Sequence, residues 1–368
     1  MHERILRARE SDPTADGPST IASLALLGHG TVGGALLDLI AERTEALAAD
    51  GLELRVVAIA DSRRMVVAPA GVEPARWRDA LAASTEPTDS AALASLGPSL
   101  ACPILVDCSA SDEPPRDYPA YFAAGYHVVT ANKRGNSGPL ERYRSLAREA
   151  RRRGRLYLYE ATVGAGLPVV DNLRRLFAAG DSLVEFSGVL SGSLSFLFGR
   201  LEDGQPFSAA VREAMARGFT EPDPRDDLSG ADVARKTLLL AREAGMALEP
   251  EDVERAGLVP PEYLAMGRDE FVARMPELDD GVAALARAAA GRGNVLRYAG
   301  SISGGRASVG VVEAGPDHPL RAVRDGENAL AFRTRYYDPA PLVVRGYGAG
   351  ALVTAAGVFG DVLRAAGR

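Results

Sequence analysis

Lysine is almost absent from this sequence. Of its 42 lysine and arginine residues only two are lysines, Lys133 and Lys236, so arginine carries nearly every positive charge. Arginine cannot release its proton near neutral pH, because its pKa stays above about 12, whereas a lysine ammonium is compact and titratable. The two lysines therefore indicate two places where a titratable point charge is needed.

Cysteine, basic stretches and long apolar runs are also scarce. Cys102 and Cys108 are the only cysteines, and no CxxC or His/Cys cluster occurs, which argues against a disulfide framework and a zinc site. The net charge of −7 and the lack of a basic stripe argue against a nucleic-acid partner. No run is long enough to span a membrane, and the first twenty residues lack an apolar signal core. We expect a cytoplasmic protein with no membrane contact and a flexible leader at residues 1–18.

What is present is ordinary for a soluble globular protein: 46% apolar and 25% charged residues in 368. A chain of this length can form two domains.

The apolar run Ile21–Leu27 ends in the sequence Gly28-His29-Gly30-Thr31-Val32-Gly33, and a helical pattern follows. Strand, G-x-G-x-x-G and helix in this order predict a dinucleotide site, with the anion held at the helix N-terminus. The predicted contacts are Gly28, Gly30, Thr31, Val32 and Gly33.

A second strand, ending at Ala60, leads into Asp61, Arg63 and Arg64. An acid here commonly binds the ribose hydroxyls of NAD, and a nearby arginine can bind the 2′-phosphate of NADP. Because both residue types are present, the sequence leaves the choice of cofactor open.

Lys133 follows a predicted strand at 127–130, and Ser109 follows another at 103–106. Ligands bind at the carboxyl ends of the strands in open α/β sheets, so both residues are candidates for cofactor contact. A helix at 140–152 and a strand at 156–159 come next. The glycine-rich loop from Glu160 to Pro168 is either a crossover or a site for a hard cation.

The segment from Gly218 to Ala241 is the strongest candidate for chemistry. Asp232 and Lys236 lie four residues apart, so they share one face of a helix predicted to run through Leu240, with Asp227 or Ser229 as its cap. Pro222 and Pro224 exclude a regular helix just before it. A surface ion pair would also fit this spacing, but the scarcity of lysine favours a functional role.

The second half of the chain has a different pattern. Strands are predicted at 183–190, 294–302, 306–313, 329–337 and 341–346, with helices around 250–290 and a last helix at 352–364. This order favours an antiparallel or mixed sheet. The predicted fold class is α/β: a Rossmann-type domain (19–158 plus 346–368) and an α+β catalytic and dimerisation domain (159–345). The open edge of the second sheet predicts a homodimer or homotetramer.

Five blocks together resemble homoserine dehydrogenases, most closely the dehydrogenase portion of bifunctional aspartate kinase–homoserine dehydrogenases, without a kinase or regulatory domain. The resemblance covers about residues 21–364. The blocks are Thr130–Lys133 (TANK), Glu160–Pro168 (EATVGAGLP), Ser187–Ser193 (SGVLSGS), Gly218–Lys236 and Gly346–Gly357 (GYGAGALVTAAG).

The resemblance implies NAD(P)H-dependent reduction of L-aspartate 4-semialdehyde to L-homoserine in threonine and methionine biosynthesis, here without inhibition by threonine. NADP(H) is expected, with NAD(H) also accepted, together with a sodium-like monovalent cation. Lys236 falls on the proton donor, with Lys133 and Asp232 beside it as catalytic residues. The remaining implied residues are Glu221, Asp227 and Asp232 for substrate; Ala60, Ser109, Lys133, Gly348 and Gly350 for cofactor, with Arg63 and Arg64 added from the sequence; and Glu160, Val163, Ala165 and Leu167 for the cation.

Two other functions are weighed against this one. A dehydrogenase that forms an acyl phosphate needs a cysteine thiolate, and Cys108 lies at a strand end near the predicted cofactor site. Its neighbours include no histidine base, which argues against that reaction. A cofactor-binding module without turnover would not need both lysines and the three acids.

Overall fold

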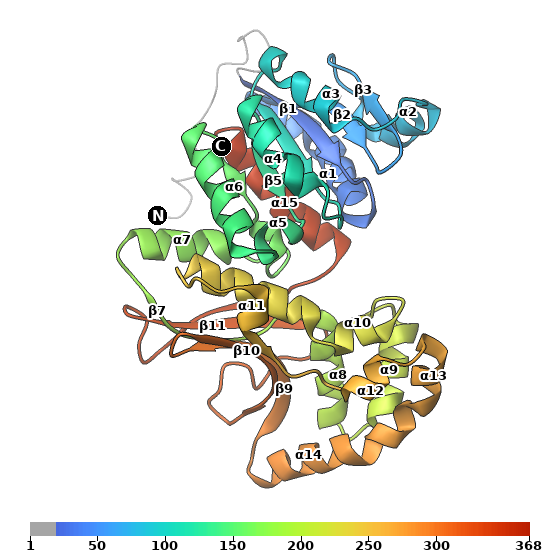
Figure 1. The fold of residues 1–368 in the computed structure, drawn as a ribbon, viewed down its shortest axis with the longest axis vertical. Helices are drawn as coiled ribbons and strands as arrows, with labels where there is room; N and C mark the ends of the chain where they lie inside the picture. The colour runs from blue at the N-terminus through green and yellow to red at the C-terminus, as the bar shows by residue number, and fades with distance from the viewer. Residues whose placement is uncertain (1–19) are drawn as a thin grey trace, which may run out of the picture.

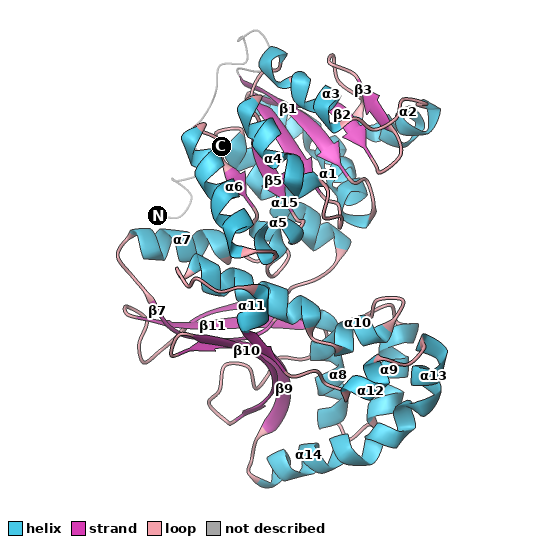
Figure 2. Ribbon diagram, viewed as in Figure 1, coloured by secondary structure: helices cyan, strands magenta, loops and turns pink. Residues whose placement is uncertain are grey.

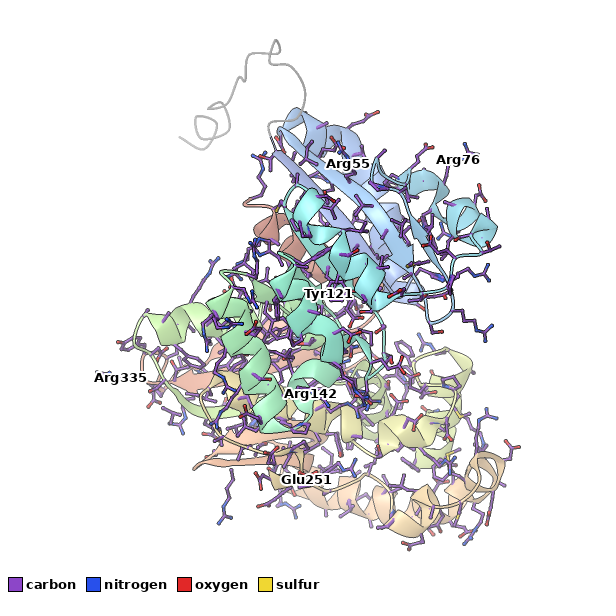
Figure 3. The ribbon with its side chains drawn as sticks, turned by 45° about the horizontal axis from the view of Figure 1, so that its top comes forward. Arg55, Arg76, Tyr121, Arg142, Glu251 and Arg335 are labelled. Carbon is purple, nitrogen blue, oxygen red and sulfur yellow. The ribbon has the colours of Figure 1, made fainter. Side chains whose placement is uncertain are left out.

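Two six-stranded sheets organise the molecule, and the computed structural model describes them within residues 20–368 (Figure 1). The predicted leader at 1–18 lies outside the described residues. Figure 3 shows Tyr121 in the body that holds the first sheet and Glu251 in the body that holds the second. Within residues 20–368, no helix is both long and apolar enough to cross a membrane.

The first sheet has the strand order β3-β2-β1-β4-β5-β6 and is parallel except for β3, which runs antiparallel to β2. Helices cover both of its faces, so β1, β2 and β4 are nearly continuous apolar runs. One face packs on α1 and α15, and the other on α4 and α6. This is the predicted Rossmann-type domain. Its strands are β1 (Thr20–Leu27), β2 (Leu52–Ala60), β3 (Met65–Val67), β4 (Pro103–Asp107), β5 (His127–Thr130) and β6 (Tyr157–Leu158).

Its helices are α1 (Thr31–Ala49), α2 (Trp77–Ala83), α3 (Ser90–Ser95), α4 (Pro114–Ala123), α5 (Arg134–Ser137), α6 (Leu140–Arg152) and, from the end of the chain, α15 (Ala351–Ala365). α15 packs beside α1 although more than 300 residues separate them. The last helix of the chain therefore completes the first domain.

The second sheet has the order β12-β11-β7-β9-β10-β8 and is antiparallel except for the β8–β10 pair. The prediction of a mixed sheet is confirmed. Its strands are β7 (Leu183–Val189), β8 (Val253–Arg255), β9 (Val295–Ser303), β10 (Arg306–Ala314), β11 (Glu327–Thr334) and β12 (Leu342–Tyr347). The accompanying helices are α7 (Val170–Ala178), α8 (Gly192–Glu202), α9 (Phe207–Ala216), α10 (Pro224–Leu228), α11 (Ala231–Glu243), α12 (Pro261–Leu264), α13 (Arg268–Arg274) and α14 (Asp279–Gly291).

Helix α11 lies at the junction of the two bodies, directly above the second sheet in the view of Figure 2. Val233, Leu238 and Leu240 are buried on it, and α11 contacts β9 and β10 on one side and α5 on the other. The position of α11 brings residues from both domains together.

Two expectations for the acidic segment are wrong. A helix, α10, does begin at Pro224, because the first turn of a helix needs no N–H at that position, and the Asp223 carboxylate accepts the Arg225 N–H at 3.0 Å. The N-cap of α11 is Gly230 rather than Asp227 or Ser229. Its φ of +70° favours glycine, and a Cβ there would lie 1.9 Å from the Tyr298 hydroxyl.

Candidate active site

The two lysines of the chain meet at one carboxylate. The Lys236 Nζ lies 2.8 Å from the Asp232 Oδ2, and the Lys133 Nζ lies 3.4 Å from the Asp232 Oδ1. Asp232 and Lys236 share a face of α11, as their spacing predicts. Lys133 comes from the other domain, directly before α5. The sequence singles out both lysines, and the structure brings them together.

A buried amide holds the loop that carries Lys133. The Asn132 side chain donates to the Asp107 Oδ2 at 3.0 Å and to the Ser111 carbonyl at 2.8 Å, and it accepts the Arg134 N–H at 3.0 Å. Asn132 is only 2% exposed. These bonds connect the carboxyl ends of β4 and β5, so the loop presents Lys133 at the edge where ligands bind in such sheets.

The partners of the Lys236 ammonium group come from its own domain. Its Nζ donates to the Leu190 carbonyl at 2.6 Å, and the residue is 8% exposed. Leu190 follows β7 and precedes the Ser191-Gly192-Ser193 turn into α8. Lys236 therefore has two partners, a carboxylate and a carbonyl, that fix its ammonium in a buried position.

The charges in this cluster shift the pKa values of Lys133 and Asp232. Burial lowers the pKa of Lys133, the Asp232 charge opposes this, and the Lys236 charge adds to it. Burial alone would raise the pKa of Asp232, but the charges of Lys236 and Lys133 hold it well below its usual range. Asp232 is therefore ionised at neutral pH, and Lys133 releases a proton more readily than an ordinary lysine.

Another predicted substrate acid, Asp227, lies within electrostatic range of both Asp232 and Glu221. Asp227 accepts the Ser193 hydroxyl at 2.8 Å and the Glu221 N–H at 2.8 Å. Burial raises the pKa of Asp227, and the charges of Glu221 and Asp232 add to the rise. Three acids beside two ammonium groups can bind a small molecule that carries a positive charge of its own.

The glycine loop, residues 28–33, packs its backbone directly against neighbouring backbone segments. A Cβ on Gly33 would lie 2.0 Å from the Gly28 carbonyl oxygen, so the start of α1 packs directly on the turn after β1. Gly28 has a φ of +83°, donates its N–H to the Ala60 carbonyl at 2.8 Å, and contacts the backbone of Ser109. Within residues 20–368, apart from its chain neighbours, no atom lies within 4 Å of a Cβ on Gly30. Thr31 and Val32 form the first turn of α1, whose N-terminal N–H groups suit an anion.

The Asp61 carboxylate already accepts hydrogen bonds within the protein. Its carboxylate accepts the N–H groups of Arg63 at 2.7 Å and Arg64 at 2.9 Å, and it lies 3.2 Å from the His29 Nε2. Burial raises the pKa of Asp61, but these hydrogen bonds lower it to about 2. Asp61, Arg64, His29 and Trp77 line a surface pocket of about 350 Å³, while the Arg63 side chain is exposed outside it. An acid and an arginine thus remain together at the predicted ribose position.

The Gly348-Ala349-Gly350 turn connects β12 to α15 across the domain junction. A Cβ on Gly348 would overlap the Asn328 side chain at 1.9 Å, and Gly350 has a φ of +115°. A Cβ on Gly192 would lie 3.6 Å from that of Ala349. The turn therefore touches the segment that leads into α8, close to the partners of Lys236.

At the predicted cation site, the Glu160 carboxylate is already hydrogen-bonded to backbone N–H groups. The Glu160 side chain accepts the N–H groups of Val170 and Asp171 at 2.8 Å each, and that of Val169, so it caps α7. No cluster of three or more His, Cys, Asp or Glu side chains suited to a metal occurs within residues 20–368. A cation here would bind chiefly to carbonyl oxygens, of which Val163, Ala165 and Leu167 are the candidates. Ala165 has the left-handed φ of +55°.

Several residues that contact the site were not predicted from the sequence. The Leu190 carbonyl gives no signal, because any residue type can supply a backbone oxygen. Ser193 and Asn132 lie inside the motif blocks, and Asp107 is an acid at the end of a buried strand. Cys108, the nucleophile of the rival reaction, is unsuited to that role, because burial and the Asp107 charge raise the pKa of its thiol.

A Rossmann-type sheet joined to a second domain with a buried acid–base cluster is the architecture of a two-domain, nucleotide-dependent oxidoreductase. Residues 168–363 match the homoserine dehydrogenase family, and residues 28–160 match the NAD-binding domain of homoserine dehydrogenase. The chain belongs to the homoserine dehydrogenase family.

One curated relative and two solved structures illustrate what the chain is similar to. A bifunctional aspartokinase/homoserine dehydrogenase of Haemophilus influenzae is 47% identical over 347 residues, which cover 94% of this chain and 43% of that protein. The chain thus spans less than half the length of this curated relative. The crystal structure of a Candida auris protein of unknown function matches at a TM-score of 0.89 and 32% identity, covering 95% of this chain and 99% of that one. A hyperthermophilic archaeal homoserine dehydrogenase in complex with NADPH shares the fold, at a TM-score of 0.72 and 24% identity, covering 94% and 98%.

Proposed function

We propose that this protein interconverts L-aspartate 4-semialdehyde and L-homoserine with a nicotinamide cofactor, as a cytoplasmic step toward threonine and methionine. The observation that carries the proposal is the meeting of Lys133 and Lys236 at Asp232, in a chain with no other lysine. Membership of the homoserine dehydrogenase family supports the same reaction.

Reduction of the aldehyde needs a proton at the oxygen as the carbon accepts hydride. The nicotinamide, when bound, supplies the hydride. The Lys236 ammonium stabilises the charge that develops on the substrate oxygen and donates a proton to it. Lys133 lies beside the same carboxylate and adds a second positive charge. Asp232 fixes both ammonium groups, and in the reverse direction Lys236 accepts the hydroxyl proton of homoserine.

The acids orient the substrate. Glu221, Asp227 and Asp232 are proposed to bind its α-ammonium group, since the Asp227 carboxyl group lies within electrostatic range of both other acids. None of them needs to act as a nucleophile, because hydride transfer forms no covalent link between substrate and protein. Asp227 is held by Ser193 and by the Glu221 N–H, so its direction is set before substrate arrives.

The cofactor is proposed to be NADP(H), with NAD(H) also accepted, because Arg63 and Arg64 follow Asp61. It would lie along the glycine loop, with Ala60, Ser109, Lys133 and the Gly348–Gly350 turn around it. A sodium-like cation is proposed at the carbonyl oxygens of Val163, Ala165 and Leu167, with Glu160 setting the loop. Residues 19–158 with 346–368 would form the cofactor domain, and residues 159–345 the catalytic and dimerisation domain.

The second sheet supports a homodimer or homotetramer. β12 is an edge strand, and its Val343 and Tyr347 are 42% and 65% exposed. Behind Val343 the sheet continues through a row of small residues, Ala331, Ser187 and Ser301, on the face opposite the covering helices. An open edge and a row of small side chains favour pairing with a second copy. Sedimentation at micromolar concentration should give an even oligomer, and a monomer alone would contradict this.

The reaction can be tested directly by absorbance at 340 nm. We expect the protein to reduce NADP⁺ with L-homoserine and, more slowly, NAD⁺. Thiol alkylation should leave the rate unchanged, since no cysteine takes part. Binding of NADPH without any turnover of homoserine or aspartate semialdehyde would instead identify a cofactor-binding module.

A further inference from the structure

Helix α11 contacts the cofactor domain at its far end as well as at the cluster around Asp232. Arg242 and Glu243 close the helix, and Glu243 lies seven residues, or about two turns, beyond Lys236. Both side chains reach into the other body, where α5, α6 and the segment after β6 lie against α11 (Figure 1).

Glu243 is a buried carboxylate with partners from both domains. It accepts the Tyr143 hydroxyl of α6, in the cofactor domain, at 3.0 Å, and also the hydroxyl of Tyr159, which directly follows that domain. Its other oxygen accepts the Arg174 Nε at 2.9 Å, and the Arg174 guanidinium lies 4.3 Å from the centre of the Tyr159 ring. The Glu243 side chain is only 5% exposed. Removing one partner would leave buried polar groups unpaired.

Arg242 connects α11 to the segment that carries Lys133. Its side chain is fully buried, and its Nη1 donates to the Asn136 carbonyl at 2.6 Å. Its remaining nitrogens donate to the Leu248 carbonyl. Asn136 lies three residues after Lys133 in α5, and its Oδ1 accepts the Tyr157 hydroxyl at 2.8 Å. α5 is therefore attached to α11 at Lys133 and again at Asn136.

We propose that Arg242 and Glu243 form a clamp that positions Lys133 against Asp232 and Lys236. They are positioning residues, since neither touches the reacting groups, and the inference rests on the proposed function. The Lys133 and Asp232 side chains are about one-third exposed, whereas those of Arg242 and Glu243 are almost completely buried. The buried bonds of the clamp are the stronger connection between the two domains.

The direct test is Glu243→Gln. Glutamine keeps the shape but replaces one of the two acceptor oxygens with an NH2 donor, so either Arg174 or the tyrosine hydroxyls lose their acceptor. A displacement of about 1 Å between reacting groups can cost about 100-fold in rate. We expect turnover to fall about 10- to 100-fold, with the dissociation constant for NADPH unchanged. The deuterium isotope effect on turnover with C4-deuterated NADPH should rise, because the chemical step becomes slower.

A matched control is Glu313→Gln. Glu313 is also a glutamate paired with arginine and an amide, Arg292 and Asn294, but it is exposed near the end of β10 and bonds to no residue of α11. Its turnover should stay close to that of the wild type. Tyr159→Phe is a second variant that deletes a single hydroxyl of the clamp, and it decides the question if Glu243→Gln fails to fold.

Hydrogen exchange gives a readout that does not depend on turnover. Faster amide exchange at residues 132–140 in both clamp variants, together with reduced turnover, supports the proposal. Unchanged exchange there, or faster exchange with wild-type turnover, overturns it. If the wild-type protein itself fails to turn over aspartate semialdehyde, the proposed function fails, and the exchange at residues 132–140 alone decides whether the clamp exists.

Discussion

The glycine loop and the cluster around Asp232 are built in opposite ways. The loop is six consecutive residues, and its shape depends on backbone atoms that a Cβ would displace, as at Gly33. The cluster combines side chains from positions 133, 232 and 236 with a carbonyl from Leu190, which belong to two domains. A substitution in the loop should therefore impair cofactor binding through steric overlap. A substitution in the cluster should impair catalysis through a change of charge or proton affinity. Mutations that separate these two kinds of failure test the comparison.

The largest effect is expected for Lys236→Arg. The change keeps the positive charge, but a guanidinium is a poor acid and is too large for a pocket shaped around an ammonium group. Loss of general-acid catalysis costs roughly 10²–10⁴-fold in rate, or about 3–5 kcal/mol of barrier. Turnover should fall by that factor, while NADPH binding measured by fluorescence stays the same.

Arg287→Lys on the exposed side of α14 is the control for exchanging the two cations, and it should behave as wild type. If Lys236→Arg keeps more than about a tenth of the turnover, the proton donor is misassigned and Lys133 becomes the candidate.

The Gly33→Ala substitution in the loop should weaken NADPH binding. The new methyl would lie 2.0 Å from the Gly28 carbonyl oxygen, so the turn must shift. Overpacking of this kind costs about 1–3 kcal/mol, which corresponds to roughly a 5- to 150-fold rise in the NADPH dissociation constant.

Gly30→Ala is the matched variant, because its methyl meets no protein atom within 4 Å. Its melting temperature should equal that of the wild type, yet it should still weaken NADPH, since the methyl occupies the space needed by the pyrophosphate. Wild-type affinity in both variants would rule out the loop as the cofactor site.

Asp232→Asn should shift the pH profile of the cluster. The Asp232 charge raises the pKa of Lys133, while burial and Lys236 lower it, so removing the carboxylate lowers that pKa further. Reduction needs Lys133 and Lys236 in their protonated forms, so the alkaline limb of the kcat/KM profile should move to lower pH. Asp226→Asn, on the exposed side of α10, should leave the limb in place. A limb that moves to higher pH would contradict the charge balance described here.

The smallest effect concerns the choice of cofactor. Replacing Arg63 and Arg64 together by alanine should raise the KM for NADPH about tenfold and leave that for NADH nearly unchanged, because charge-assisted bonds to the 2′-phosphate are lost. Arg76→Ala, an exposed arginine in the same domain (Figure 3), is the control. Equal changes for both cofactors would show that neither Arg63 nor Arg64 binds the 2′-phosphate.

Sequence reasoning was most successful where local patterns carry the information. The apolar run before Gly28 predicts β1, and the pattern over 140–152 predicts α6 at its observed bounds. It failed where tertiary contacts override local rules. Strands β3 and β8 have three residues each and no clear pattern, and the N-cap of α11 is a glycine because Tyr298 leaves no room for a side chain.

By itself the sequence determined which residues are unusual. Two lysines among 40 arginines, and glycines at fixed spacing after an apolar strand, are properties of composition and order, so they can be read without a fold. The tertiary structure alone decided that Lys133 lies 3.4 Å from Asp232, that Leu190 supplies a carbonyl to Lys236, and that Glu243 contacts Tyr143 of the other domain. These contacts join residues about 50 to 100 positions apart, and a backbone carbonyl or a buried hydroxyl leaves no mark in the sequence pattern, because its role depends only on which surfaces the packed domains bring together.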